Sequence, residues 1–191
     1  MICWQAGTFR QLFGISLPES MYDNFRTTSG DEMPIKNASA PTASITRKQL
    51  IDLLNEDLAR EYQAIIGYIN HSQVLKGAAY MNIAAELVVH AGEELAHAII
   101  LSNQIDYLGG MPTTVPKPVK TSQKAEEMLR FDLDNENTTI RNYRRRVMQC
   151  DELGEFATAE HIREILMQEQ DHQIALATAL GIDAPDVGIA D

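Results

Sequence analysis

The chain has 191 residues, of which 45% are hydrophobic and 23% charged, which fits one globular domain or one domain with an added arm. Its formal net charge is −11, a field that attracts cations and disfavours DNA, RNA and anionic membranes as partners. No apolar run reaches about eighteen residues, so no membrane-spanning helix is predicted. With only two cysteines and no clear secretory signal, we expect a cytoplasmic protein with reduced thiols.

The first 45 residues differ in composition from the rest and are interpreted as an extension or linker. Residues 1–32 contain aromatic side chains without a sustained period (Trp4, Phe9, Phe13, Tyr22 and Phe25). Residues 33–45 are small and polar and include two prolines, which is typical of a linker. Two interpretations remain open. Either Met33 is the true start of the protein, or the first 32 residues are an arm that packs on a neighbouring surface.

From Thr46 the apolar residues recur at spacings of three, four and seven, which predicts helices. We expect four of them, at about 46–75, 78–108, 122–150 and 155–180, with glycines marking most of the ends. Between the second and third, the proline-rich segment MPTTVPKPVK cannot be helical and predicts a long crossover. The fold class is therefore all-α, a four-helix bundle over residues 46–181, and residues 182–191 form a tail too short for a fifth helix.

Two Glu-x-x-His units occur in this pattern, Glu94-Leu-Ala-His97 and Glu169-Gln-Asp-His172. Residues three apart lie on one helix face, so both side chains of a unit can reach one metal ion. Another Glu stands thirty-three residues before each unit. The second half of the bundle thus repeats the first with an offset of seventy-five residues, which pairs Glu61 with Glu136, Glu94 with Glu169, His97 with His172, Ile65 with Ile140 and Tyr68 with Tyr143.

A lone Glu-x-x-His unit is usually a solvated helix face, but these six residues have apolar neighbours along their helices. Four buried carboxylates without partners would be very costly, and two divalent cations would offset their charge. Carboxylate and imidazole ligands favour iron or manganese, and the absence of thiolates argues against structural zinc. Two adjacent redox metals can pass two electrons to O2 or hydrogen peroxide.

The residues lie in the segments EYQAIIGYINH, EELAHAIILSNQIDYLGG, EMLRFDLDNEN and EILMQEQDH. With these segments, residues 46–180 resemble bacterioferritin, within the ferritin-like superfamily, over about two thirds of the chain. The resemblance implies a ferritin-like bundle with a ferroxidase centre. It implies that Glu61 and His97 bind one iron, that Glu136 and His172 bind the other, and that Glu94 and Glu169 bridge the two.

The resemblance also implies roles for three further residues. Tyr68 matches the family's tyrosine near the first ligand, where it can supply a third electron; the alternative is a core tyrosine with a satisfied hydroxyl. His90 and Glu93 match an inner-surface iron site of the family. The alternatives are a surface histidine at position 90 and, at position 93, a carboxylate that braces a ligand histidine.

Three departures from the family pattern modify these expectations. Leu95 stands where the family has a haem-ligating methionine, so haem is not expected. Gln168 replaces an acid that orients a histidine, which can retune the metal. The missing fifth helix puts a twenty-four-subunit shell in doubt, so a homo-oligomer between a dimer and a cage of twelve or twenty-four subunits remains open.

The leading hypothesis is therefore a ferroxidase that oxidises Fe(II) with O2 or hydrogen peroxide and stores the product as iron. The enzyme alternative is a di-metal oxidase or peroxide-degrading protein with iron or manganese, similar to manganese catalase or to rubrerythrin without its four-cysteine module. The non-enzyme alternative is a DNA-protecting mini-ferritin. The acidic balance and the complete site within one bundle disfavour that alternative.

Overall fold

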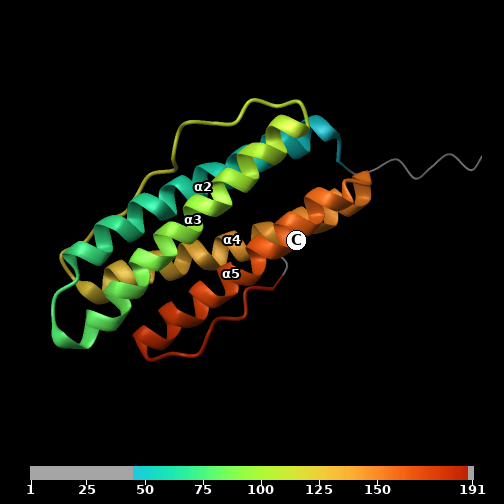
Figure 1. Ribbon diagram of the computed structural model, residues 1–191. Coiled ribbons are helices and arrows are strands. Elements are labelled where there is room, and N and C mark those ends of the chain that lie inside the picture. The colour runs from blue at the N-terminus through green and yellow to red at the C-terminus, as the bar shows by residue number, and fades with distance from the viewer. Residues whose placement is uncertain (1–44, 189–191) are drawn as a thin grey trace, which may run out of the picture. The chain divides into compact units, whose positions relative to one another are not determined.

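A computed structural model of the chain describes residues 45–188, and this part consists of four long helices and one short helical turn (Figure 1). The helices are α2 (Arg47–Val74), η3 (Ala78–Tyr80), α3 (Met81–Tyr107), α4 (Ala125–Leu153) and α5 (Phe156–Leu180). No strand occurs in these residues. The predicted all-α fold class and its four helices are confirmed. The predicted extension or linker lies outside the described residues except for Ile45, and residues 182–188 of the tail are not helical.

The ends of the helices follow local chemistry. Thr46 caps α2 in a capping box, in which its side chain accepts from the Gln49 backbone N–H and Gln49 bonds back to the Thr46 backbone. Helices α4 and α5 end at Gly154 and Gly181, whose φ angles of 75° and 69° are left-handed and favour glycine. The predicted third helix was about three residues early at both ends, because Ser122 and Lys124 precede α4 rather than begin it.

Helix α2 packs chiefly on α3, and α4 packs chiefly on α5, so the bundle consists of two hairpins. The crossover between them runs along α2 (Figure 1), where the Lys117 backbone N–H donates to the Ala59 carbonyl at 2.9 Å. The Gln63 side chain donates to the Pro118 carbonyl at 2.6 Å. These bonds satisfy backbone groups of a proline-rich segment that cannot bond within a helix. The predicted crossover is therefore an ordered strap on the bundle.

The hydrophobic core has two parts with a polar layer between them. One cluster contains Leu54 and Leu58 of α2 together with Leu101 of α3 and Ile162 of α5. The other contains Leu87, Leu129, Leu133 and Leu176, together with Tyr68. Along each long helix the two clusters occupy opposite ends, so the residues between them are buried whatever their polarity. Among the described residues, no helix combines the length and apolar character needed to cross a membrane.

The seventy-five-residue offset extends to two buried ion pairs that the sequence analysis did not single out. Arg146 donates to both oxygens of Asp57, at 2.6 and 3.1 Å, and links α4 to α2. At the equivalent positions, His71 Nδ1 lies 2.9 Å from Asp132 and links α2 to α4. All four residues are at least 97% buried. The two hairpins are thus tied by one pair at each end of the polar layer.

His71 also holds the crossover. Its Nε2 lies 3.0 Å from the Lys120 carbonyl, while its Nδ1 faces the Asp132 carboxylate. Both partners accept hydrogen bonds, so the arrangement is complete when the ring carries two protons. Burial works against that charge, but the Asp132 contact prevails and raises the pKa of His71 above its usual value.

We expect Arg146→Met to lower the free energy of unfolding by about 3–5 kcal/mol, because it leaves the Asp57 carboxylate buried without its cation. Adding Asp57→Leu should recover most of the loss, since both charges are then replaced by apolar groups. Chemical denaturation of the metal-free protein, followed by circular dichroism, measures both variants. A double variant as unstable as Arg146→Met alone would contradict this account.

Candidate metal centre

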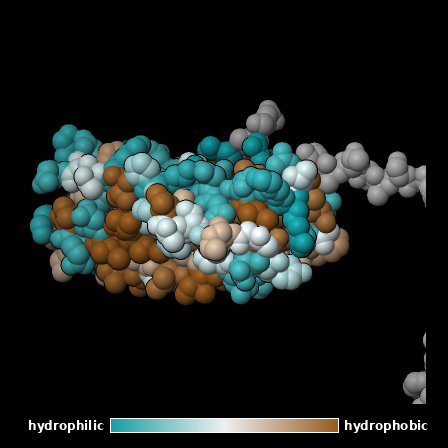
Figure 2. Space-filling model, turned by 90° about the horizontal axis from the view of Figure 1, so that it is seen from above, coloured by the Kyte–Doolittle hydropathy of each residue, from teal (hydrophilic) through white to brown (hydrophobic). Residues whose placement is uncertain are grey.

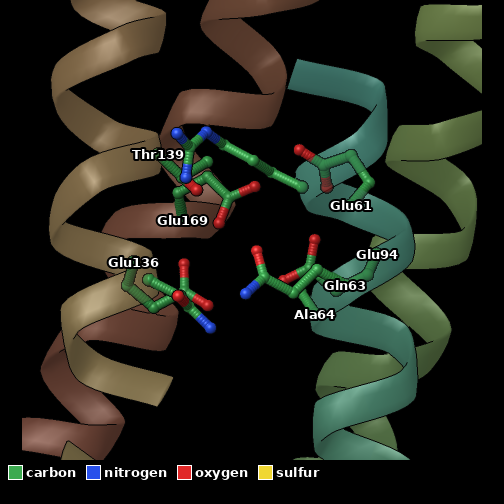
Figure 3. A pocket seen from close by; sticks show the side chains of 9 residues that line it. Glu61, Gln63, Ala64, Glu94, Glu136, Thr139 and Glu169 are labelled. Atoms are coloured by element: carbon green, nitrogen blue, oxygen red, sulfur yellow. The ribbon is translucent and has the colours of Figure 1, made fainter. Parts of the chain in front are cut away.

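The six residues predicted to bind metal meet in the polar layer at the middle of the bundle. Glu61 comes from α2, Glu94 and His97 from α3, Glu136 from α4, and Glu169 and His172 from α5; all are at least 98% buried. Figure 3 shows the four labelled glutamates around a common space. A small pocket between α2 and α4 adjoins this space and is also lined by Arg60, Gln63, Ala64, Asn135 and Thr139.

Their ligand atoms form two overlapping groups. The first contains Glu61, Glu94, His97 and Glu169, and the second contains Glu94, Glu136, Glu169 and His172. Within each group one atom of every residue lies within 4.8 Å of the others. Glu94 and Glu169 belong to both groups, so each could contribute to two ion positions. We call the first group the His97 position and the second the His172 position.

Both histidines turn Nδ1 toward the carboxylates. His97 Nδ1 lies 3.0 Å from Glu94, 3.1 Å from Glu169 and 3.3 Å from Glu61. His172 Nδ1 lies 3.1 Å from Glu94 and 3.7 Å from Glu169. The single Nδ1–H of His97 cannot donate to three carboxylates at once. A cation between these atoms would instead bind all four side chains of the first group, those of Glu61, Glu94, His97 and Glu169.

The unpaired atoms of the cluster test whether a metal fits. Five carboxylate oxygens and His172 Nδ1 are buried and form no hydrogen bond; the oxygens are Glu61 Oε2, Glu94 Oε1, Glu136 Oε2 and both oxygens of Glu169. Buried acceptors without donors are costly, and native proteins avoid them unless something else binds there. Oxygen and imidazole donors in this number suit two iron or manganese ions.

The pKa values reflect the crowding of these charges. Burial, and then the neighbouring Glu94 and Glu169 carboxylates, raise the pKa of Glu61 well above its usual value. Burial and the Glu169 carboxylate do the same for Glu136. Burial opposes ionisation of Glu94 as well, but the nearby His172 and His97 rings hold its pKa below the usual range. Without cations, the cluster must therefore keep protons that metal ions would displace.

In each position, a tyrosine hydroxyl donates a hydrogen bond to the glutamate that the two positions do not share. The Tyr68 hydroxyl donates to Glu136, and the Tyr143 hydroxyl donates to Glu61. Burial, and then the nearby carboxylates, raise the pKa of both hydroxyls well above 10, so both stay protonated. Tyr68 therefore points at the site as expected. The seventy-five-residue offset pairs Tyr143 with Tyr68, but the sequence pattern predicted no role for Tyr143.

The far nitrogen of each histidine bonds to the neighbouring helix. His172 Nε2 lies 2.9 Å from a Glu93 carboxylate oxygen, and His97 Nε2 lies 2.7 Å from the Gln168 amide oxygen. Both contacts leave Nδ1 as the nitrogen that faces the cluster. Glu93 therefore makes the contact expected of a carboxylate that braces a ligand histidine, and Gln168 contacts His97 through a neutral group.

His90 lies inside the bundle rather than on a surface. It is 97% buried and stacks on His172, with ring centroids 4.1 Å apart. Burial, and then the facing His172, lower the pKa of His90 to about 4, so the ring is neutral near pH 7. Its Nδ1 is buried without a hydrogen bond. His90, Glu93 and His172 form a third group of possible ligands beside the His172 position, so the suggested surface histidine is wrong for residue 90.

Comparisons with known proteins agree with this geometry. The family model described as "Ferritin-like domain" matches residues 51–183. The bacterioferritin of Desulfovibrio desulfuricans is 33% identical over 127 residues, which cover 66% of this chain and 71% of that protein. The bacterioferritin of Brucella melitensis is 29% identical over 135 residues, covering 70% and 84%. A solved ferritin-like, diiron-carboxylate protein from Bacillus anthracis aligns with a TM-score of 0.68 and 33% identity, covering 70% of this chain and 96% of that one.

We expect the metal-free protein to bind two divalent ions per chain within the bundle. Replacing both shared carboxylates, in Glu94→Ala/Glu169→Ala, should abolish the binding of both ions, because each position loses two ligands at once. Titration with Co(II) under anaerobic conditions measures the stoichiometry. As a matched control, Glu160→Ala/Glu164→Ala removes two exposed carboxylates of α5 and should bind two ions as before. One ion per chain in the wild type would refute the paired centre.

Proposed function

The chain belongs to the ferritin-like family, and from that premise we propose that it oxidises Fe(II) at a paired metal centre and stores the product. The observation that carries the proposal is the set of buried, unpaired carboxylate oxygens shared between two four-residue groups. A pair of redox-active ions in such a centre supplies the two electrons that reduce O2 or hydrogen peroxide. We propose iron as the metal; manganese has the same ligand preferences.

The proposed ligand roles follow the grouping of the side chains. Glu61 and His97 would bind one ion, and Glu136 and His172 the other, with Glu94 and Glu169 shared. The protein would hold the carboxylates close together and away from water. Groups that are already fixed in place would then stabilise the charge that changes on the ions. Tyr68 and Tyr143 hold the orientation of Glu136 and Glu61.

Tyr68 is also our candidate for a third electron. Its hydroxyl bonds to Glu136, which gives a phenol one hydrogen bond away from a proposed ligand. The Glu136 carboxylate can take the phenolic proton as the electron leaves, so no free charge is left on the buried ring. Tyr143 has the same geometry at Glu61, which makes it the natural comparison for Tyr68.

Storage requires an oligomer that encloses a space, and the surface of the bundle supports association of copies. Val88, Leu95 and Ile99 follow one another along a face of α3 and are 53–63% exposed. Ile66 and Ile69 of α2 are also about half exposed. A broad hydrophobic area is visible in the view of Figure 2. An apolar area of this kind favours a homo-oligomer.

The expectation that Leu95 provides no haem ligand stays a prediction.

Anaerobic Fe(II) followed by O2 or hydrogen peroxide should produce one rapid oxidation of two Fe(II) per chain, seen by stopped-flow absorbance. Further Fe(II) should then be taken up slowly, far beyond two per chain. Iron counted per purified particle, together with the particle's mass, measures storage. If the wild type never holds more than two irons per chain, the di-metal oxidase or peroxide-degrading alternative replaces storage. Copurifying DNA would favour the DNA-protecting alternative.

We expect His90→Ala to leave the rapid phase intact and to slow the later uptake severalfold. His90 carries an unpaired buried nitrogen beside His172, so it can take iron that leaves the centre. His90 is changed rather than Glu93, because Glu93 also contacts His172 of the paired centre. His161→Ala, at an exposed histidine of α5, is the control. Uptake that is unchanged in His90→Ala would remove the proposed iron site at His90 and Glu93 but leave storage standing.

A further inference from the structure

The internal repeat makes the inner ligands of the two positions equivalent. Each position has one glutamate of its own, one histidine that presents Nδ1, and the two shared carboxylates. Each of the separate glutamates also accepts from a tyrosine of the other hairpin. Any difference between the two ions must therefore come from residues outside the six.

The Nε2 atoms of the two histidines, which point away from the cluster, make different contacts in the two positions. His172 Nε2 faces the carboxylate of Glu93, whereas His97 Nε2 faces the neutral amide of Gln168 at the equivalent place in the repeat. A carboxylate that accepts from a ligand imidazole raises the basicity of the metal-binding nitrogen, and a neutral amide does so less. The Glu93 side chain is about two thirds buried, so solvent screens its charge only in part.

Two other places near the cluster also differ between the halves of the repeat. Arg60, next to Glu61 on α2, lines the pocket at the cluster, and its counterpart in the repeat is the neutral Asn135. His90 stacks on His172 and places an unpaired nitrogen there, while its counterpart Ile165 has no polar atom. The His172 position is thus richer in negative charge and donor atoms.

We propose that Glu93 and Gln168 set an order of occupancy, in which the His172 position binds its ion first and more tightly and the His97 position fills second. This inference rests on the proposed paired centre and adds a role for two residues outside its six ligands. Toward the two ions of the pair they are positioning residues, because each acts on its ion through a histidine.

The test is a calorimetric titration of the metal-free protein with Co(II) under anaerobic conditions, where the wild type should bind two ions in separate steps. Glu93→Gln should weaken the first step by about tenfold to a hundredfold, the usual effect of removing such a contact. Gln168→Glu should strengthen the second step by a similar factor. Glu164→Gln, which removes an exposed charge elsewhere on α5, should change neither.

The exchange variant Glu93→Gln/Gln168→Glu decides the assignment of the order. Crystals with one equivalent of Co(II) should have anomalous density beside His172 in the wild type and beside His97 in the exchange variant. Two ions bound in equal steps by the wild type, or an unchanged first position in the exchange variant, would overturn the inference and leave the paired centre intact. A wild type that binds fewer than two ions would overturn the paired centre itself.

Discussion

Four carboxylates buried at the middle of one helical bundle are the constraint on which the rest of this structure depends. Each must lose its hydration, and together they repel one another in a medium of low dielectric. The hydrophobic clusters on either side keep water out, so groups within the polar layer itself must compensate the carboxylate charges. Two histidines, two tyrosines and the proposed cations provide this compensation. A stable fold and the proposed affinity for cations are thus consequences of the same arrangement.

The repeat explains how one short motif builds a complete site. Each hairpin contributes one Glu, one Glu-x-x-His unit and one tyrosine, and each tyrosine supports the glutamate of the other hairpin. The Asp57–Arg146 and His71–Asp132 pairs follow the same rule, crossing between α2 and α4. Neither hairpin supplies partners for all of its own buried polar groups. This dependence couples the folding of the two halves to the assembly of the centre.

The two halves of the repeat share their ligand atoms but differ in the residues that surround them. A repeat with identical outer residues would present two equal metal positions. Glu93 against Gln168 and Arg60 against Asn135 give the two positions different surroundings, although the ligand atoms match. Residues one layer outside the ligands can therefore set the order in which ions bind without altering the fold that holds them. A centre of this kind can evolve its metal affinity separately from its geometry.

The sequence by itself determined the four helices and the crossover, because helical periodicity depends only on local geometry. The two Glu-x-x-His units and the family resemblance led us to expect that six residues on different helices would meet. The offset of seventy-five residues also paired Tyr68 with Tyr143. Only the tertiary structure decided what each side chain meets across helices. It turned His90 inward onto His172 and gave Glu93 to His172. It also joined Arg146 to Asp57. Such contacts depend on how one helix is rotated against another, and rotation is fixed by packing of the whole bundle rather than by any single segment.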